Sequence, residues 1–507
     1  MKKSKESSFV LTLPLKTEIW QEHILDKKFD VCRKIYNAVL NQALIRYNNL
    51  INNQDYIQLN DKLKEINKKY HETKDNNSKK QLNQQRKDLY SQLNNLYSQF
   101  GLTEYSFHNY VKPMYNHFNI NSHIGQTLAT RVYNAIKKLL DGKAKKVNFI
   151  KYGELYSIEG KTNKQGIIFK DNKIKFNKIE IPVIIKEKNY YAKEALDNRI
   201  KYCRIKRQII KGKTKYYVQL ILEGIPPQKT NKETGEIKNP IGVGKVGIDI
   251  GTQTVAITSN NEVKLLELAP NVVKIDKEIK RLQRKLDRSR RKNNPENFNE
   301  NDTIKKGKKL KWKKSKKYIK TQMKLKELFR KQKEIRKLDH NIMNNWLIGL
   351  GDDFKVETMN YKALQKRSKK TKKDKNGKFK SKKRFGKSLA NKAPAMFISI
   401  LERKLKYYNI KLSKINTWTV KASQYNHLNH QYNKKKLSQR WNELEYNSRQ
   451  LKIQRDLYSA FLIMCVNDNL CEVNDKLCEQ YFDNFLELHN VEIKRLDGNN
   501  NLSSMGI

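Results

Sequence analysis

The 507-residue sequence has only five cysteines and no long apolar run, and each of these two shortages excludes a class of protein. Its five cysteines form no Cys-x-x-Cys pair, so we expect no disulfide framework and a reducing compartment. No apolar stretch approaches the roughly 18 residues of a membrane-spanning helix, and the apolar run at the N-terminus is too short for a secretion signal. We therefore expect a protein of the bacterial cytosol, associated with the nucleoid and without a membrane partner.

Acidic residues are scarce beside basic ones, since 51 Asp and Glu face 107 Lys and Arg, a formal net charge of +56. Such a charge repels itself unless a polyanion neutralises it, and nucleic acid is the polyanion of matching charge density. Hydrophobic residues make up 37% of the chain, with 26 Tyr and 17 Phe, which is enough for a substantial core. The composition predicts a folded protein that binds nucleic acid.

The first half of the chain changes its hydrophobic period twice. Alternation predicts a strand over 8–15, helical spacing follows over 17–141, and short strands return over 145–224, most clearly in a hairpin over 203–222. We expect the strand at 8–15 to join this later β-domain across the helical insertion. The Pro-, Gly- and charge-rich linker 225–245 predicts a domain boundary.

The second half alternates strands and helices. Three antiparallel strands, then helix, strand, helix, strand and helix, is the order of the RNase H-like fold. The predicted elements are strands at 246–250, 255–258 and 263–266, a long basic helical region at 274–350 broken by a loop, a strand at 354–358, a helix at 394–408, a strand at 411–420 and a helix at 451–467.

Three acids fall where an RNase H-like site needs them: Asp249 in the first strand, Glu357 at the end of the fourth and Asp456 on the last helix. Two divalent cations about 3.5–4 Å apart can activate water and stabilise the leaving oxygen in phosphodiester hydrolysis, and Mg²⁺ prefers carboxylate ligands. Each acid lies in or beside an apolar run, where a charge is costly without a cation. We predict that all three are catalytic and bind two Mg²⁺ ions, although each alone could be a turn, strand-end or surface residue.

The segment GIDIGTQT (247–254) also resembles the phosphate-binding hairpin of sugar kinases and actin-like ATPases. Those folds need Gly-Gly turns at the nucleotide, and this sequence contains no Gly-Gly. A charge of +56 would also serve no purpose there, so the sequence favours a nuclease.

Taken together, the motifs resemble the TnpB family of transposon-encoded RNA-guided nucleases and the compact type V CRISPR effectors related to it. Asp249, Glu357 and Asp456 fall on the three RuvC motifs, and the resemblance covers nearly the whole chain. The other matching segments are SIEGKTNKQGI (157–167), RLQRKLDRSRRKNNPEN (281–297), KSLANKAPAMFISILERKL (387–405), and KASQYNH and LSQRW before the third motif.

The resemblance implies an α+β multidomain protein with a split wedge β-barrel, a helical recognition module inserted in it, and an RNase H-like (RuvC) nuclease domain. It places the first wedge strand at 1–16, the recognition module at 17–141, the rest of the wedge at 142–240, and RuvC at 241–507, with a basic helical insertion at 270–350 and a degenerate zinc-ribbon-like target-nucleic-acid segment at 405–450.

The same resemblance implies partners. A guide RNA, derived from a transposon end or from a CRISPR array, would pair with double-stranded target DNA next to a short flanking motif, in a complex with one protein copy. The residues predicted to contact nucleic acid are Arg284, Arg288, Arg290, Arg291, Lys366, Arg367, Lys369, Lys370, Lys382, Lys383 and Arg384.

Two positions depart from the TnpB pattern. The zinc-ribbon segment 421–448 contains no cysteine, only His427 and His430, so we expect no zinc. Ser459 stands where an Asn usually follows the third acid, which questions the rate of cleavage. A guide-directed repressor that does not cut, and a DNA transposase of the same fold class, remain alternatives.

Overall fold

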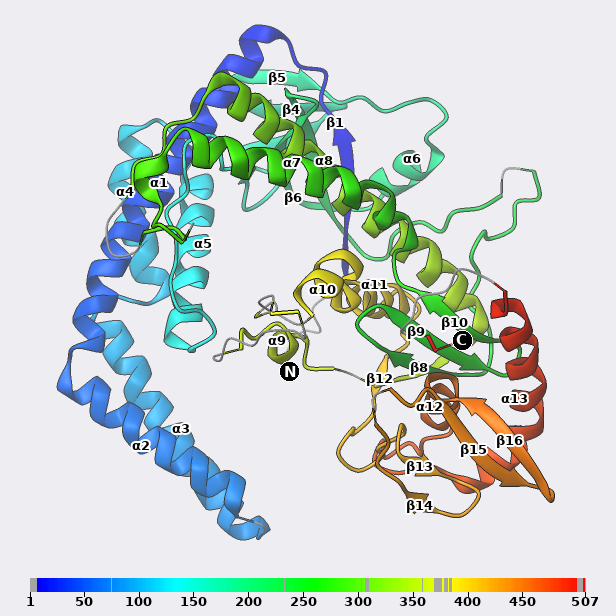
Figure 1. Cartoon of the computed structure of the whole chain (residues 1–507). Coiled ribbons are helices and arrows are strands. Elements are labelled where there is room, and N and C mark those ends of the chain that lie inside the picture. The colour runs from blue at the N-terminus through cyan, green and yellow to red at the C-terminus, as the bar shows by residue number, and fades with distance from the viewer. Residues whose placement is uncertain are drawn as a thin grey trace. The chain divides into compact units, whose positions relative to one another are not determined.

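The computed structural model describes residues 7–73, 75–231, 233–301, 303–305, 310–357, 359–368, 376–377, 382, 385–436, 438–498 and 505–506 (Figure 1). The chain divides into two compact units, Met1–Pro227 and Gln228–Ile507, and is a mixed α+β protein with several sheets. No helix in the described part of the chain combines the length and the apolar character needed to cross a membrane.

The first unit contains a four-stranded antiparallel sheet in the order β1-β7-β6-β2. β1 buries Phe9, Leu11 and Leu13 and exposes the residues between them, the pattern of a strand with one face on a core. Its pairing with β7 confirms the prediction that this strand joins the hairpin at 203–222. The unit's strands and short helix are β1 (Ser8–Pro14), β2 (Ser157–Glu159), β3 (Ile167–Lys170), β4 (Lys173–Phe176), β5 (Ile179–Pro182), α6 (Tyr190–Leu196), β6 (Ile200–Ile210) and β7 (Lys213–Glu223).

Helices occupy the segment between β1 and β2, as predicted for 17–141. α3 begins after a break in this helical segment, where the Asp75 carboxylate accepts a hydrogen bond of 2.7 Å from the Ser78 amide. Leu63, Leu89 and Leu93 form the buried contact between α2 and α3. The helices are α1 (Ile19–Ile51), α2 (Gln54–Glu72), α3 (Asn76–Gln99), α4 (Glu104–His117) and α5 (Ser122–Leu140).

The second unit is built on a five-stranded sheet in the order β10-β9-β8-β11-β12. β8 (Lys245–Ile250), β9 (Thr254–Ser259) and β10 (Val263–Glu267) are antiparallel neighbours, and β11 (Asp353–Val356) runs parallel to β8. These four strands lie where the sequence predicted them, although Thr358 falls outside the described residues.

The fifth predicted strand, over 411–420, is wrong beyond its first half. β12 covers only Ser413–Lys414, parallel to β11. The chain turns directly afterwards, because the Asn416 carbonyl accepts a hydrogen bond of 3.0 Å from the Val420 amide.

The last predicted helix, over 451–467, begins later than expected. Residues before Arg455 pair as a hairpin, β15 (Trp441–Tyr446) with β16 (Arg449–Gln454), whose turn places Asn447 and Ser448 at positive φ of 50° and 59°. The remaining elements are η1 (Pro270–Val272), α7 (Val273–Lys292), η2 (Pro295–Asn297), α8 (Lys316–Leu347), η3 (Ile348–Leu350), α9 (Tyr361–Leu364), α10 (Gly386–Lys392), α11 (Pro394–Lys406), β13 (Tyr425–Asn426), β14 (Gln431–Tyr432), α12 (Arg455–Met464) and α13 (Asp475–Leu496).

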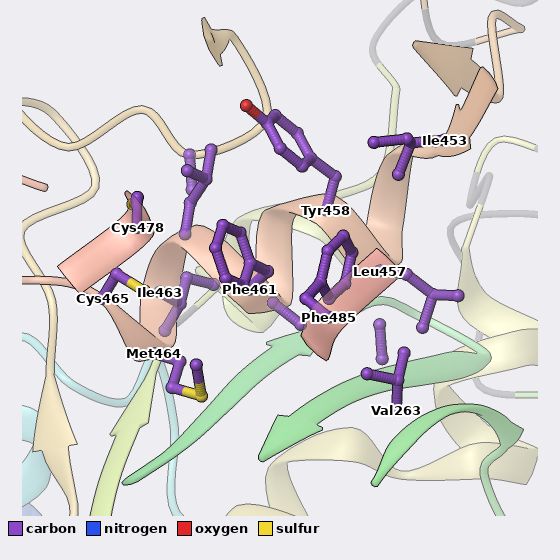
Figure 2. Packing of buried hydrophobic residues seen from close by; sticks show 14 of the residues in the cluster. Val263, Ile453, Leu457, Tyr458, Phe461, Ile463, Met464, Cys465, Cys478 and Phe485 are labelled. Carbon is purple, nitrogen blue, oxygen red and sulfur yellow. The ribbon is translucent and has the colours of Figure 1, made fainter. Parts of the chain in front are cut away.

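Each face of the five-stranded sheet is covered by helices. On one face, Ile248 and Phe354 pack against Phe397 and Leu401 of α11. On the other, α12 packs on β8 and β9 while α13 packs on β10, and Figure 2 shows Phe461 of α12 against Phe485 of α13. Because α12 is buried along almost its whole length, its first turn has a fixed position over the sheet.

Candidate active site

Gly247 in the middle of β8 sets how closely α12 approaches the sheet. A Cβ atom at this position would lie 2.0 Å from the Ala460 carbonyl oxygen and 2.4 Å from the Met464 nitrogen. Since side chains alternate along a strand, Asp249 points to the same face of the sheet as Gly247. Asp456 precedes Ala460 by four residues and lies on the same side of the helix. The close packing of β8 and α12 therefore brings Asp249 and Asp456 to one face.

Glu357 comes next to Asp249 through the parallel pairing of β11 with β8. Val356 pairs with Ile248, and the Glu357 amide donates a hydrogen bond of 3.1 Å to the Ile248 carbonyl. Neighbouring strands lie about 4.8 Å apart, so Glu357 follows the ladder directly beside Asp249. The structure thus gathers all three predicted acids on one face of the sheet.

Lys355 of β11 binds the C-terminal end of α12, whereas Asp456 lies at the N-terminal end of that helix. It is 2% exposed, and its ammonium group donates a hydrogen bond to the carbonyl of Val466, just beyond the C-terminus of α12. A cation at a helix C-terminus offsets the partial negative charge there. Lys355 and Glu357 share one face of β11, so this contact also aligns the strand that carries Glu357.

The electrostatics of the site show that the acids are crowded. Burial raises the pKa of Asp249 well above its usual range, and the negative charges of Glu357 and Asp456 raise it further. Burial also raises the pKa of Glu357. Neither Asp249 nor Glu357 has an ion-pair partner in the part of the chain that the structure describes. Two half-buried carboxylates without an ion-pair partner offer the hard oxygen ligands that a divalent metal ion prefers.

Asp456 differs because arginines already neutralise it. Arg455 Nη2 lies 3.0 Å from its Oδ1, and Arg440 Nη1 lies 3.6 Å from its Oδ2. The carboxylate also stands in the first turn of α12, where the helix dipole favours negative charge. Among the described residues, no group of three His, Cys, Asp or Glu side chains is already arranged around one metal position.

Tyr361 is a site residue that the sequence analysis missed. Its hydroxyl is buried and has no hydrogen-bond partner among the described residues. Burial raises the pKa of this phenol, and the charges of Asp249 and Glu357 raise it further, so the hydroxyl keeps its proton. Asn360 caps the short helix α9 that begins here, by accepting a hydrogen bond of 3.0 Å from the Ala363 amide. The signal in the sequence is only a tyrosine four residues after Glu357.

Comparison with known proteins adds two structures of low similarity. No family model and no curated protein matches the chain. The cryo-EM structure of the Cas12f1–sgRNA–target DNA complex is similar, at 12% identity and a TM-score of 0.43, over 92% of this chain and 100% of that chain. A CRISPR–Cas12f ternary complex gives 14% identity and a TM-score of 0.28, over 90% and 86%. TM-scores below 0.5 do not establish a family or a function for this chain.

The predicted nucleic-acid contacts on α7 fall into two groups. Arg284 and Arg288 line a surface pocket of about 370 Å³ together with three further basic residues, Lys277, Lys280 and Arg281. Arg290 and Arg291 instead pair with Asp287 at 2.7 and 2.9 Å and lie over the rings of Trp312 and Phe298.

The structure describes only some of the nucleic-acid contacts that are predicted over 366–384. Lys366 and Arg367 are exposed, and Lys382 is half-buried. Lys369, Lys370, Lys383 and Arg384 lie outside the described residues.

His427 and His430 have separate partners. The Nδ1 atom of His427 lies 2.7 Å from the Tyr458 hydroxyl, its ring packs against Phe482, and burial lowers its pKa to about 4. His430 contacts Asp475 at 3.2 Å. The absence of zinc from this segment stays a prediction.

Proposed function

We propose that this chain is an RNA-guided DNA endonuclease whose hydrolytic site is formed by Asp249, Glu357 and Asp456. The observation that carries the proposal is the gathering of these acids, from three distant segments, on one face of the sheet. A net charge of +56 supports nucleic acid as the substrate. The resemblance of the sequence motifs to TnpB supports guidance by RNA.

Asp249 and Glu357 would hold Mg²⁺, because they are half-buried carboxylates without an ion-pair partner among the described residues. Bound Mg²⁺ ions supply an activated water and stabilise charge on the leaving oxygen. Arg455 and Arg440 hold the carboxylate of Asp456 at the start of α12, at the rim of the same site. The Tyr361 hydroxyl keeps its proton beside Asp249 and Glu357, so it is a hydrogen-bond donor for a phosphate oxygen of the strand.

For the rest of the chain, we assign 1–16 and 142–240 to the split wedge domain, 17–141 to the recognition module and 241–507 to RuvC. Guide RNA and the guide–target heteroduplex would bind the first two, and the protein would act as one copy in the ribonucleoprotein. The exposed Arg284 and Arg288 of α7, with Lys366 and Arg367, are the described basic residues that we assign to phosphate contacts.

Sequencing the RNA that co-purifies with the protein tests RNA guidance. We expect one defined RNA, and replacing its guide portion should redirect binding and Mg²⁺-dependent cleavage to the matching DNA. Cleavage that ignores the guide sequence, or a protein that co-purifies with no defined RNA, would contradict the proposal.

A guide-directed DNA-binding protein that does not cut is the second candidate. The pairing of Asp456 with Arg455 and Arg440 favours it, because a carboxylate held by arginines is less available to a metal ion. Such a protein would bind the guided target and leave it intact in Mg²⁺.

A further inference from the structure

Trp418 is unusually exposed for a residue whose neighbours are fixed. Its side chain is 85% exposed, whereas Ile415 and Val420 on either side are 4% and 0% exposed and belong to the core around α12. Asn416 closes the turn between them. Its amide donates to the Leu470 carbonyl at 2.8 Å, and its side-chain oxygen accepts from the Trp418 amide at 3.1 Å. The fold therefore holds an indole ring out into solvent.

This turn follows the carboxyl end of β12, and the same edge of the sheet carries the candidate active site. Lys414 pairs with Val356, and the Ile415 amide donates to the Val356 carbonyl at 3.1 Å. Glu357 extends β11 at this edge and Asp249 extends β8 beside it. In open sheets of this kind, ligands bind at the carboxyl ends of parallel strands. Trp418 thus follows Ile415 by three residues, and Ile415 is bonded to the residue that precedes Glu357.

A second exposed aromatic ring lies on the segment that follows this turn. Tyr432 of β14 is 48% exposed and packs on Tyr425, with ring centroids 4.8 Å apart. The ammonium group of Lys421 lies over the Tyr432 ring, 5.7 Å from its centroid. We call Trp418, Lys421 and Tyr432 the Trp418 strip. Trp418 and Lys421 lie between β12 and β13, and Figure 1 shows β12, β13 and β14 in the same part of the second unit as α12.

The charge of this part of the sequence points to an anionic occupant. Between Arg403 and Asn442 there are ten Lys or Arg residues and no Asp or Glu. An apolar protein partner would gain nothing from that charge, whereas a phosphate backbone is neutralised by it.

We propose that the Trp418 strip is a stacking platform for unpaired bases of the nucleic-acid strand at the candidate active site. Aromatic rings stack on any base, and a lysine between them neutralises the adjacent phosphates. Bases of a duplex are already stacked on each other and offer no free face, so the strip selects single strands. Its role at the active site rests on the proposed nuclease function, but its binding of a single strand does not.

Binding of an oligothymidylate strand to the full chain carrying Asp249→Asn tests this proposal without cleavage. We expect Trp418→Ala to weaken binding by about 5- to 100-fold, since stacking contributes on the order of 1–3 kcal/mol per base. Trp418→Phe should keep most of the affinity because it keeps a ring. Thr417→Ala, one residue away in the same turn, is the matched control and should bind like the parent. The variants are compared after circular dichroism shows equal folding.

Fluorescence gives a second readout, because Trp418 is the most exposed of the chain's five tryptophans. Oligothymidylate should quench the emission of the parent, and Trp418→Phe should remove most of that quenching. Equal affinities for Trp418→Ala and Thr417→Ala, or an equal loss for duplex DNA, would overturn the platform. If the strand binds with the Trp418 signature while the ribonucleoprotein of the unsubstituted chain leaves its guided target uncut in Mg²⁺, the platform stands and the nuclease proposal fails.

Discussion

At Asp249, burial and the neighbouring charges of Glu357 and Asp456 act in the same direction on the pKa. The folded protein therefore binds a proton at this residue more tightly than the unfolded chain does. Asp249 is a position where the fold gives up stability to keep a carboxylate in place, which is common at functional sites. Substitution of such a residue is expected to raise stability and to lower activity.

We predict that Asp249→Asn raises the free energy of unfolding by about 1–2 kcal/mol near neutral pH in the presence of a chelator. The variant removes a half-buried charge that two other carboxylates repel. Adding Mg²⁺ should raise the melting temperature of the parent but not that of the variant, because ligand binding stabilises only a protein that binds it. Thermal unfolding of both proteins, with chelator and with Mg²⁺, measures this. A parent that is insensitive to Mg²⁺ would contradict the metal assignment.

The pH dependence has the same origin. Because the folded pKa of Asp249 is raised, its contribution to stability is present below the unfolded pKa of about 4 and is lost as the pH rises through the folded pKa. Without a divalent cation, the parent should therefore lose stability relative to Asp249→Asn as the pH increases above about 4. Chemical unfolding of the pair across this range tests the sign. A difference that stays constant with pH would mean that Asp249 is not crowded by charge.

Tyr361→Phe removes only a hydroxyl that has no hydrogen-bond partner in the described part of the chain. We predict that it lowers the rate of cleavage by about 10- to 100-fold, the value of one hydrogen bond to a charged group, and leaves the affinity for DNA unchanged. Because a buried polar atom without a partner is removed, stability should not fall. A loss of stability together with activity would show that the hydroxyl has a structural role instead.

At the scale of elements, the site depends on the close contact of β8 and α12. Gly247→Ala would place a methyl group against the backbone of α12, so we predict a loss of about 1–3 kcal/mol in the free energy of unfolding and a loss of cleavage. Gly251→Ala is the control, because the nearest atoms to its added Cβ lie at 3.4 Å. Nucleic-acid binding should persist in both. Normal cleavage by Gly247→Ala would show that the spacing of strand and helix does not set the site.

Helices and strands can be predicted well from the sequence where the hydrophobic periodicity is strong. The strands carrying Asp249 and Glu357 could be placed because they are short apolar runs bounded by turn residues. The start of α12 could not, because Asn447 and Ser448 form a turn that pairs β15 with β16, and the apolar spacing over 451–454 suits strand and helix alike. β12 ends early for a similar reason, since the side chain and carbonyl of Asn416 close a turn that leaves no trace in the hydrophobic pattern.

The candidate site was also predicted only in part from the sequence. Three acids could be chosen from their order along the chain, but the pairing of Asp456 with Arg440 depends on a contact 16 residues away in sequence across a hairpin. Tyr361 was missed because its significance lies in its missing hydrogen bond, which only three-dimensional contacts reveal. The separate environments of His427 and His430 likewise follow from packing and not from their spacing.

At the scale of the whole molecule, a charge of +56 is distributed over two units that each have their own sheet and helices. A protein with this surplus of cations exchanges counterions for phosphates when it binds, so its affinity for nucleic acid should fall steeply with salt. The three acids of the candidate site form a local cluster of negative charge in this basic molecule. A nucleic-acid strand attracted by the basic surface would meet them at one edge of the sheet. Binding and cutting are thus expected to be separable.

Cleavage of guided target DNA by the purified ribonucleoprotein tests the central claim most directly, with the parent, Asp249→Asn and Glu357→Gln compared in Mg²⁺ and in chelator. We predict that the parent cuts in Mg²⁺ only, and that both variants bind the same target with similar affinity and leave it uncut. Cutting by Asp249→Asn at the rate of the parent, or cutting by the parent in chelator, would contradict the account.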